Sequence, residues 1–253
     1  MADSIAFLDS TDILDESEVR WRIGVIALAT DRILERDFAL MCPDASLGIY
    51  INRIAFANPT TRENLLAMAP RLRETAALLL PGQKLDVIAY GCTSGTALIG
   101  HDAVARSIKE VKPDATVATP SHSAMLALKE LGARRIGMLA PYVEPVTRAV
   151  VDCFEAENFE VMSPCCLGLE DDDEITRVSP DKIVELAERV CPADAEAMFL
   201  SCTALRSIGV IEKLESRLGI PVLSSNQVMF WRSMRAAGCD FRPDGFGRLL
   251  SEH

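Results

Sequence analysis

The sequence lacks the features of membrane, secreted and nucleic-acid-binding proteins. No apolar run approaches the roughly 18 residues that a membrane span needs. Residues 1–20 have no basic segment and no apolar core of the kind that a secretory signal requires. The formal net charge of −11 disfavours nucleic acid and anionic membrane surfaces. We therefore expect a cytoplasmic protein with reduced cysteines, no nucleic-acid partner and no membrane partner.

Patterns typical of metal and redox sites are also missing. None of the eight cysteines forms a C-x-x-C pair, and the three histidines do not cluster with cysteines at the spacing of a zinc site. The adjacent Cys165 and Cys166 are interpreted as a strand end that turns one thiol inward, not as a redox pair. The sequence therefore predicts no metal ligands.

Short aliphatic segments alternate with helix-like ones along most of the chain, which is the mark of an α/β fold with parallel sheets. The predicted strands are Arg22–Leu28, Ser46–Ala55, Asp86–Tyr90, Thr116–Ala118, Arg135–Leu139, Glu160–Cys165, Ala197–Leu200 and Pro221–Leu223. The predicted helices are Thr61–Leu80, His101–Val111, Ser121–Leu131, Val143–Glu157, Ser179–Val190, Ser207–Leu218 and Gln227–Ala237. Short aliphatic strands of this kind are typical of sheets covered on both faces.

An internal repeat divides the chain into two halves. Arg22–Ala27 matches Arg135–Ala140 at an offset of 113 positions, and two cysteine segments match at an offset of 110. We therefore predict an α/β protein of two pseudo-symmetric doubly wound lobes, each a short parallel sheet flanked by helices, with the active site in the cleft between them. The predicted division is an acidic N-terminal extension (1–20), an N-terminal lobe (21–120 plus 224–253) and a C-terminal lobe (121–223).

Each half carries a strand-like run that ends in a Cys-Thr pair. Leu85–Thr96 contains Cys92, and Ala195–Ala204 contains Cys202. In open α/β sheets, ligands bind beyond the carboxyl ends of the strands, where free N–H groups and the positive end of a helix favour a carboxylate. Two thiols that face each other across a cleft suit proton transfer to opposite faces of a small carbon acid.

The free N–H groups and the positive helix end that favour a carboxylate also favour a thiolate over a thiol. We therefore expect the pKa values of Cys92 and Cys202 to lie below the value of about 8.5 for a free cysteine. Cys92 is then expected to react with iodoacetamide at neutral pH faster than the other cysteines. Thr93, Ser94 and Thr203 are predicted to donate hydrogen bonds to a substrate carboxylate. The alternative is that Cys92 and Cys202 are ordinary buried cysteines, but their matched contexts favour a site.

Three segments carry a resemblance to a known family. Gly91–Thr96, Ser201–Thr203 and Ala140–Tyr142 resemble motifs of the aspartate/glutamate racemase superfamily, in the branch of maleate cis-trans isomerase and arylmalonate decarboxylase. The resemblance runs from about Trp21 to Gly238. Further segments resemble the ectoine-utilisation A proteins of that branch, namely Leu28–Asp31 with Glu35, Asn58-Pro59, Ala89–Cys92, Gly168–Asp171 and Ser224–Gln227.

The resemblance implies a cofactor-independent isomerase or racemase of a small carboxylic or dicarboxylic acid. In that chemistry Cys92 is the nucleophile or base, Cys202 is the acid, and the Tyr142 hydroxyl binds a substrate carboxylate, without a metal or an organic cofactor. Decarboxylation followed by protonation from one cysteine is the alternative reaction. The family also implies a homodimer or larger homo-oligomer, for which Phe38–Met41 is a candidate contact segment.

Two acidic positions depart from the isomerase pattern. Asp31 stands where that branch has a carboxylate-binding asparagine, and Glu170–Asp173 lies near a second such position. An ionised carboxylate repels a dicarboxylate and pairs with a cation, so Asp31 points to a zwitterionic, amino-acid-like substrate or a cyclic amidine of the ectoine kind. The alternative for Asp31 is a helix cap. Glu170–Asp173 is expected to be a solvated loop, and the alternative is a lid that selects a positive group.

Four further polar residues follow strands or motifs and have open roles. Ser121 and Asn226 are interpreted as helix caps or ligand contacts, and His122 as a packed or exposed helix residue rather than a general base. Arg206 is interpreted as a partner of a carboxylate, as a group that lowers the Cys202 pKa, or as half of an ion pair between the lobes.

Overall fold

The computed structural model describes Ile5 and residues 18–253. The predicted acidic extension over residues 1–20 therefore lies largely outside the described residues. No helix in the described part of the chain is long and apolar enough to cross a membrane.

Two parallel sheets of four strands form the framework, and their strand orders match. The first sheet has the order β2-β1-β3-β4 and the second the order β6-β5-β7-β8. The strands are β1 Trp21–Leu28, β2 Leu47–Ile54, β3 Val87–Gly91, β4 Thr116–Ala118, β5 Arg135–Tyr142, β6 Glu160–Leu169, β7 Ala197–Leu200 and β8 Val222–Ser224. The same order in both sheets confirms the predicted pair of pseudo-symmetric α/β lobes.

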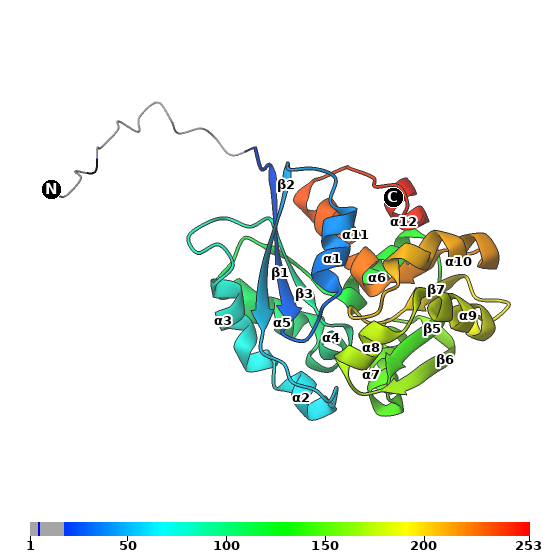
Figure 1. Ribbon diagram of the computed structural model, residues 1–253. Coiled ribbons are helices and arrows are strands. Elements are labelled where there is room, and N and C mark those ends of the chain that lie inside the picture. Colours follow the sequence, from blue (N-terminus) through cyan, green and yellow to red (C-terminus); the bar gives the residue numbers. More distant parts are fainter. Residues whose placement is uncertain (1–4, 6–17) are drawn as a thin grey trace.

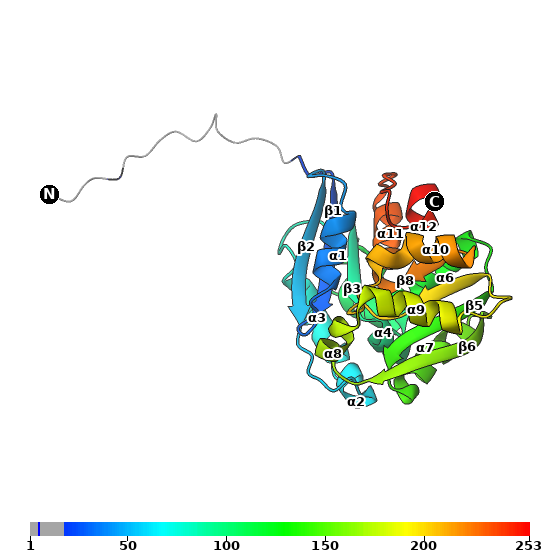
Figure 2. The same cartoon turned by 45° about the vertical axis from the view of Figure 1, so that its right-hand side comes forward.

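Helices cover the sheets in both lobes. They are α1 Leu34–Met41, α2 Arg62–Leu66, α3 Leu72–Ala77, α4 Thr93–Ile99, α5 His101–Lys109, α6 Pro120–Glu130, α7 Glu144–Glu155, α8 Asp172–Arg177, α9 Pro180–Val190, α10 Ile211–Leu218, α11 Ser225–Ala237 and α12 Arg248–Glu252, with short 3₁₀ turns at Ala69–Arg71 and Ile208–Val210. Figures 1 and 2 show the two sheets side by side, with α1 and α11 on one side of the first sheet and α3 on the other.

The single helix expected over Thr61–Leu80 is wrong. The chain forms α2, a 3₁₀ turn that contains Pro70, and then α3. Proline has no N–H for the helical ladder and crowds the preceding turn, so Pro70 interrupts the helix despite the apolar spacing around it.

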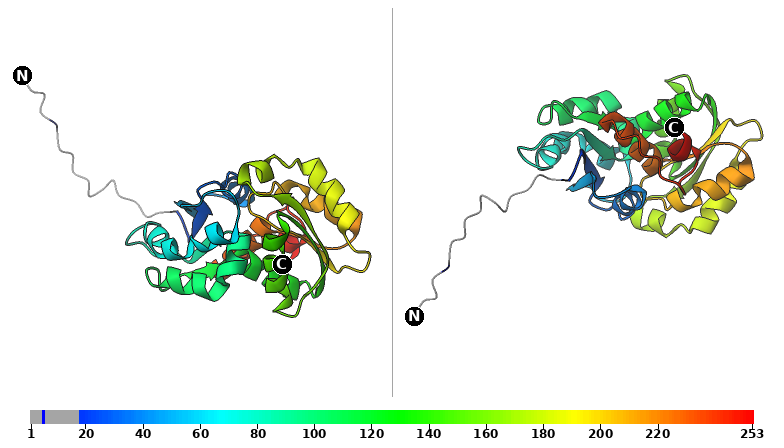
Figure 3. Two further views of the ribbon diagram at one scale, coloured as in Figure 1. Left: turned by 90° about the horizontal axis from the view of Figure 1, so that it is seen from below. Right: turned by 90° about the horizontal axis from the view of Figure 1, so that it is seen from above.

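The last long helix returns to the first lobe. After β8, α11 packs against β1, β3 and β4 of the first sheet and against α1 and α6. The rings of Phe38 on α1 and Phe230 on α11 meet edge to face, with centroids 5.3 Å apart. Figure 3 shows the two lobes as halves of one body, with α11 lying between them. This packing is compatible with the predicted division at 121 and 224, which stays a prediction.

The segment Phe38–Met41 does not offer the apolar surface that the sequence suggested. Phe38 and Met41 are 0% and 1% exposed because α1 turns them into the core, and only Leu40, at 52%, is an exposed large apolar side chain of this segment.

Candidate active site

One small cavity between the lobes holds both cysteines of the internal repeat. Cys92 follows the last residue of β3, and Cys202 lies two residues beyond β7, the equivalent strand of the second sheet. The cavity is lined by Leu28, Phe56, Thr60, Leu65, Cys92, Thr93, Ser94, Tyr142, Asp172, Cys202 and Thr203. Its volume is about 10 Å³, which is room for roughly one water molecule, so a substrate must widen it to enter.

The sequence-predicted site residues gather here with one exception. Cys92, Cys202, Tyr142 and the hydroxyl residues Thr93, Ser94 and Thr203 all line the cavity, whereas Asp31 does not. Parallel strands explain the convergence, because their carboxyl ends lie at one edge of each sheet and the two edges face each other.

Cys92 is the N-terminal cap of α4. Its sulfur accepts a hydrogen bond from the Gly95 N–H at 3.2 Å and lies 3.8 Å from the Ser94 hydroxyl oxygen. Burial nevertheless raises the pKa of the Cys92 thiol to about 12, against the lowering effect of these two contacts. The expectation of a thiol pKa below that of a free cysteine is therefore wrong for this closed cavity, because loss of hydration outweighs the local donors.

Cys202 has an unusual backbone. Its φ of +104° is rare for a residue with a side chain. Burial, followed by the charge of Asp172, raises the thiol pKa well above its ordinary value, while a hydrogen bond with the Tyr142 hydroxyl lowers it. A residue keeps such an unfavourable backbone conformation only where surrounding contacts fix it. Cys202 has a contact of this kind. Its N–H donates to the Ser225 hydroxyl oxygen at 3.0 Å.

Hydrogen bonds link the two cysteine segments, one of them directly and the others through Ser225 at the start of α11. Thr203 donates to the Gly91 carbonyl at 3.3 Å, and Thr93 donates to the same Ser225 oxygen that holds Cys202, at 2.8 Å. Sequence reasoning missed Ser225. The signal in the sequence is its place just after a predicted strand, next to the candidate Asn226.

Asp31 makes local hydrogen bonds at the start of α1, although Ile33 and not Asp31 is the N-cap residue of that helix. Its Oδ1 accepts from the N–H groups of Ile33 and Leu34, at 2.8 and 3.0 Å, at the start of α1. Its Oδ2 is buried with no hydrogen-bond partner. A substrate contact of Asp31 stays a prediction, and it would have to use this second oxygen.

Asp172 is the acidic residue that reaches the cavity. It is 6% exposed, accepts a hydrogen bond from the Thr30 hydroxyl, and burial raises its pKa to about 6. The solvated loop expected for Glu170–Asp173 is therefore wrong at Asp172, although Asp173 is exposed and pairs with Arg32. The sequence Glu170–Asp173 contains four consecutive acidic residues and no apolar periodicity, so it does not indicate that Asp172 is the one that is buried.

The same segment ties the lobes together beside the cavity. The Thr60 N–H donates to the Glu170 carbonyl at 2.6 Å, and the Asp172 N–H donates to Asn58 Oδ1 at 3.3 Å. Together with the Thr30–Asp172 and Arg32–Asp173 contacts, these bonds join the loop after β6 to the first lobe. Opening of the cavity would require some of them to break.

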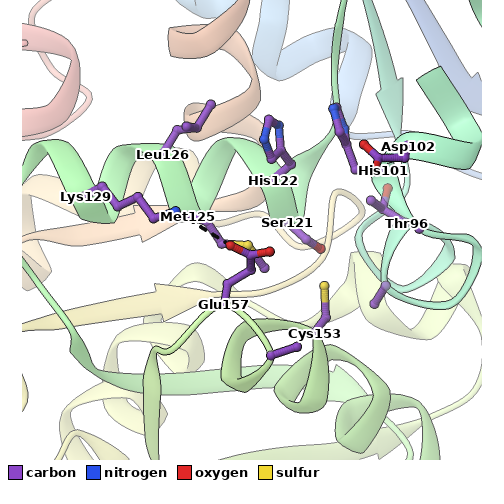
Figure 4. Close-up of a pocket in the computed structure, with 13 residues that line it drawn as sticks. Thr96, His101, Asp102, Ser121, His122, Met125, Leu126, Lys129, Cys153 and Glu157 are labelled. Atoms are coloured by element: carbon purple, nitrogen blue, oxygen red, sulfur yellow. Dashed lines mark ion pairs between the residues drawn. The ribbon is translucent and has the colours of Figure 1, made fainter. Parts of the chain in front are cut away.

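A larger cavity of about 400 Å³ lies apart from the cysteine pair, against α5, α6 and α7. In Figure 4, His101 and His122 stand next to each other on one side, and Cys153 of α7 and Glu157 in the turn after α7 lie opposite. The two imidazole rings stack with centroids 3.8 Å apart, and burial lowers the pKa of both. Neither Cys92 nor Cys202 lines this cavity, so we do not place the chemistry here.

The remaining polar candidates have backbone partners. Ser121 donates to the Thr93 carbonyl at 3.3 Å, and Arg206 bonds to the carbonyls of Val178 and Arg177 rather than to a carboxylate. Asn226 is not a helix cap, because Ser224 caps α11 in a capping box with Gln227. Among the described residues, no group of three or more His, Cys, Asp or Glu side chains is arranged to hold a metal ion.

Fold and site together define a class: two-lobed α/β proteins in which each lobe delivers one cysteine to a shared, buried cavity. The family model of arylmalonate decarboxylase matches residues 70–250, and the chain belongs to this family.

Individual relatives support the same assignment. A maleate isomerase of Geobacillus stearothermophilus is 26% identical over 246 residues, covering 91% of this chain and 97% of the relative. Arylmalonate decarboxylase of Bordetella bronchiseptica is 34% identical over 139 residues, covering 53% of this chain and 57% of the relative.

A solved structure is similar over nearly the whole chain. It is a cysteine-to-serine mutant of Nocardia farcinica maleate cis-trans isomerase with a covalently bound succinylcysteine intermediate. The TM-score is 0.84 at 23% identity, covering 92% of this chain and 99% of the other. These matches confirm the resemblance to the maleate isomerase and arylmalonate decarboxylase branch. The closer resemblance to ectoine-utilisation A proteins stays a prediction.

Proposed function

We propose that this protein is a cofactor-independent isomerase of a small carboxylic acid that works with Cys92 and Cys202. The observation that carries the proposal is the shared cavity, which brings one thiol from each lobe to the same enclosed space. Relatives that are maleate isomerases, among them one with a covalent succinylcysteine, support this reaction type.

The proposed reaction begins with a carbon–sulfur bond. The Cys92 thiolate adds to one alkene carbon of a cis unsaturated acid, and the electron pair of the double bond moves to the neighbouring carbon, next to a carboxylate. The Cys202 thiol gives its proton to that carbon, and the bond between the two carbons is then single and can rotate. Return of the proton to Cys202 and loss of the Cys92 sulfur restore the double bond in the trans form.

Formation of the Cys92 thiolate is the demanding step, because burial disfavours it. The Gly95 N–H and the Ser94 hydroxyl are the groups beside Cys92 whose hydrogen bonds favour the charged sulfur. For Cys202, the Tyr142 hydroxyl plays the same part. We propose that the substrate carboxylate is held by hydroxyl groups of the cavity wall, namely Thr93, Ser94, Tyr142 and Thr203.

Arylmalonate decarboxylation is the second reaction type. The family match and the relative that is 34% identical over half of the chain support it. In that reaction carbon dioxide leaves first, and one cysteine protonates the resulting enediolate. Two thiols in one cavity favour isomerisation or racemisation, which use both.

A zwitterionic, amino-acid-like substrate is a second candidate for the ligand, and Asp172 is the observation that favours it. No lysine, arginine or histidine belongs to the described residues that line the cavity, whereas Asp172 does. Above about pH 6, the ionised Asp172 carboxylate would therefore repel a dianion, whereas it would pair with an ammonium or amidinium group.

Proton NMR in heavy water tests the proposal. Maleate, arylmalonates, aspartate, glutamate and ectoine-like acids are incubated with the wild-type protein and with the variants Cys92→Ser, Cys202→Ser and Cys153→Ser. We expect conversion or deuterium exchange of one of these acids without release of carbon dioxide, lost in the first two variants and retained in Cys153→Ser. Release of carbon dioxide would establish the decarboxylase instead. Conversion that survives both active-site substitutions would rule out the two-cysteine mechanism.

We further propose a cytoplasmic homodimer or larger homo-oligomer. The family resemblance supports it, and Leu40, Leu78 and Phe241 are exposed large apolar side chains available for contact. Light scattering after size-exclusion chromatography measures the mass, and the 27.6 kDa of one chain would contradict the proposal.

A further inference from the structure

A buried acid–amide pair lies behind the Cys202 loop, outside the cavity. Asp37 on α1 is 0% exposed, and Asn226 in the first turn of α11 is 1% exposed. The Asn226 amide nitrogen donates to Asp37 Oδ2 at 2.8 Å and to the Thr203 carbonyl at 2.9 Å. Because the Thr203 carbonyl can only accept, the amide nitrogen must face it, and the orientation of the Asn226 side chain follows.

Two oxygens of this pair lack a partner. Asp37 Oδ1 and Asn226 Oδ1 are both buried, and neither has a hydrogen-bond partner among the described residues. A buried oxygen without a donor destabilises the folded state, and an unpaired buried carboxylate does so more strongly. None of the ion pairs in the described part of the chain involves Asp37.

One proton accounts for both unpartnered oxygens. We infer that Asp37 is a neutral carboxylic acid whose proton is shared with Asn226 Oδ1, and that this pair positions the Cys202 loop. The acid and the amide then form two hydrogen bonds with each other, and the second amide hydrogen of Asn226 remains on the Thr203 carbonyl. The inference concerns the state of the resting protein and rests on the proposed function only for its effect on catalysis.

The electrostatic surroundings agree with a neutral acid. Burial is the largest effect on Asp37 and raises its pKa to about 7, against the hydrogen bond from Asn226 and the charge of Arg36. Asp31, in the loop before α1, adds to the increase. The neighbouring strand β2 presents Arg53, which bonds to the carbonyls of Leu28 and Asp31 and to Glu35.

The pair occupies a place from which it can act on both cysteines. Asn226 follows Ser225, whose hydroxyl oxygen accepts from the Cys202 N–H and from Thr93. The first turn of α11 therefore holds the backbone on both sides of Cys202 and contacts the residue after Cys92. Asp37 anchors that turn to α1 and is a positioning residue, not a catalytic one.

The test uses Asp37→Asn, which keeps a neutral partner for Asn226 but cannot ionise. The folding equilibrium constant is measured by urea unfolding from pH 4 to pH 8 for the wild type, for Asp37→Asn and for Glu35→Gln, a matched control at an exposed acid on the same helix. A pKa raised from 3.8 to about 7 lowers the wild-type constant by about a thousandfold as the pH rises through this range. We expect Asp37→Asn to show only the smaller decrease that Asp172, whose pKa is raised to about 6, still contributes, and Glu35→Gln to retain the full wild-type decrease. Equal pH dependence of the wild type and Asp37→Asn would overturn the inference.

Two measurements keep the inference testable if Asp37→Asn does not fold. Infrared spectra of Asp172→Asn, which lacks the other buried aspartate with a raised pKa, should show with ¹³C-labelled aspartate a protonated carboxyl band at pH 6 that fades toward pH 8. Absence of that band at pH 6 would overturn the neutral acid. For the positioning role, Asn226→Leu should change the rate at which iodoacetamide alkylates Cys202 by at least tenfold and leave Cys153 unchanged. An unchanged Cys202 rate would overturn that role independently of any substrate.

Discussion

The Thr203 hydroxyl donates a hydrogen bond to the Gly91 carbonyl, 3.3 Å away, so the residue after one cysteine holds the residue before the other. Gly91 ends β3, and Thr203 follows β7, the equivalent strand of the other lobe. This bond makes the distance between the thiols depend on how the lobes meet, and it can be broken by a single substitution.

Thr203→Val should therefore weaken both stability and turnover. Valine keeps the shape of threonine but leaves the Gly91 carbonyl without this donor, at a cost of about 1 kcal/mol in the free energy of unfolding. Thr203→Ser, which keeps the hydroxyl, should recover most of the loss. Urea unfolding and the NMR conversion assay measure the two effects, and equal behaviour of the valine and serine variants would show that the bond is unimportant.

Gly95→Ala should disturb Cys92 directly. A Cβ at this position would lie 2.8 Å from the Cys92 sulfur, 2.9 Å from the Tyr90 hydroxyl and 3.0 Å from the Met68 methyl carbon. Overpacking of this kind costs about 1–3 kcal/mol, and displacement of a reacting group by about 1 Å lowers turnover by about 10²-fold. Gly209→Ala is the matched control, because nothing lies within 4 Å of its added methyl group. Turnover of Gly95→Ala at the wild-type level would mean that Cys92 tolerates the shift.

The buried Cys92 thiol should react slowly at neutral pH, which reverses the expectation from the sequence. Its raised pKa of about 12 keeps it protonated, and it is 4% exposed, whereas Cys165 and Cys166 are partly exposed. Site-resolved mass spectrometry after brief iodoacetamide treatment at pH 7 should show Cys165 and Cys166 modified before Cys92. The opposite order would mean that the cavity opens readily and that the thiolate is favoured in the open form.

The same raised pKa has a consequence for stability. We take the ordinary cysteine pKa of 9.0 for Cys92 in the unfolded chain. Because the pKa is higher in the folded protein, the contribution of Cys92 to the free energy of unfolding is fully present below pH 9 and is lost as the pH rises toward 12. Replacement by serine should reduce the loss of stability above pH 9, as measured by urea unfolding at pH 8 and pH 10. Parallel curves for the wild type and Cys92→Ser would contradict the raised pKa.

Asp172→Asn should change which ligands bind. Removal of the charge from the cavity wall is expected to strengthen binding of dicarboxylates and to weaken binding of zwitterions, each by about 10- to 100-fold, because a hydrogen bond to a charged group contributes about 1.5–3 kcal/mol. The difference should be largest above pH 6, where the wild-type carboxyl is ionised. Asp173→Asn serves as the control, since that carboxylate is exposed and pairs with Arg32. Calorimetric titration that finds both variants equal to the wild type would remove Asp172 from substrate selection.

Sequence reasoning reached the framework because its signals are local or repeated. The matching segments at Arg22 and Arg135, together with alternating strands and helices, predicted two lobes with parallel sheets, and both sheets have the same strand order. The Cys-Thr pairs predicted that both cysteines sit at carboxyl ends of strands, where the structure has them. The prediction of one helix over Thr61–Leu80 is wrong because apolar spacing alone does not take account of Pro70. The covalent geometry of proline limits a helix more strongly than apolar spacing favours it.

Other features were decided by contacts between segments far apart in the chain. The approach of β3, β7 and the loop after β6 removes water from the cavity, and this burial, rather than the helix end beside Cys92, sets the direction of both thiol pKa values. The same packing turns Asp172 inward from an acidic run and leaves Asp31 bonded to the N–H groups of Ile33 and Leu34 at the start of α1.

By itself, therefore, the sequence determined the two-lobed fold and the pair of cysteines, because periodicity and internal repeats are properties of the residue order and need no knowledge of tertiary contacts. The tertiary structure decided the protonation of the thiols, the acid that faces them and the Ser225 and Asn226 contacts that hold their loops. Those properties depend on which groups lose their water and which partners they meet, and both are set by packing between residues from 23 to 189 positions apart in the chain.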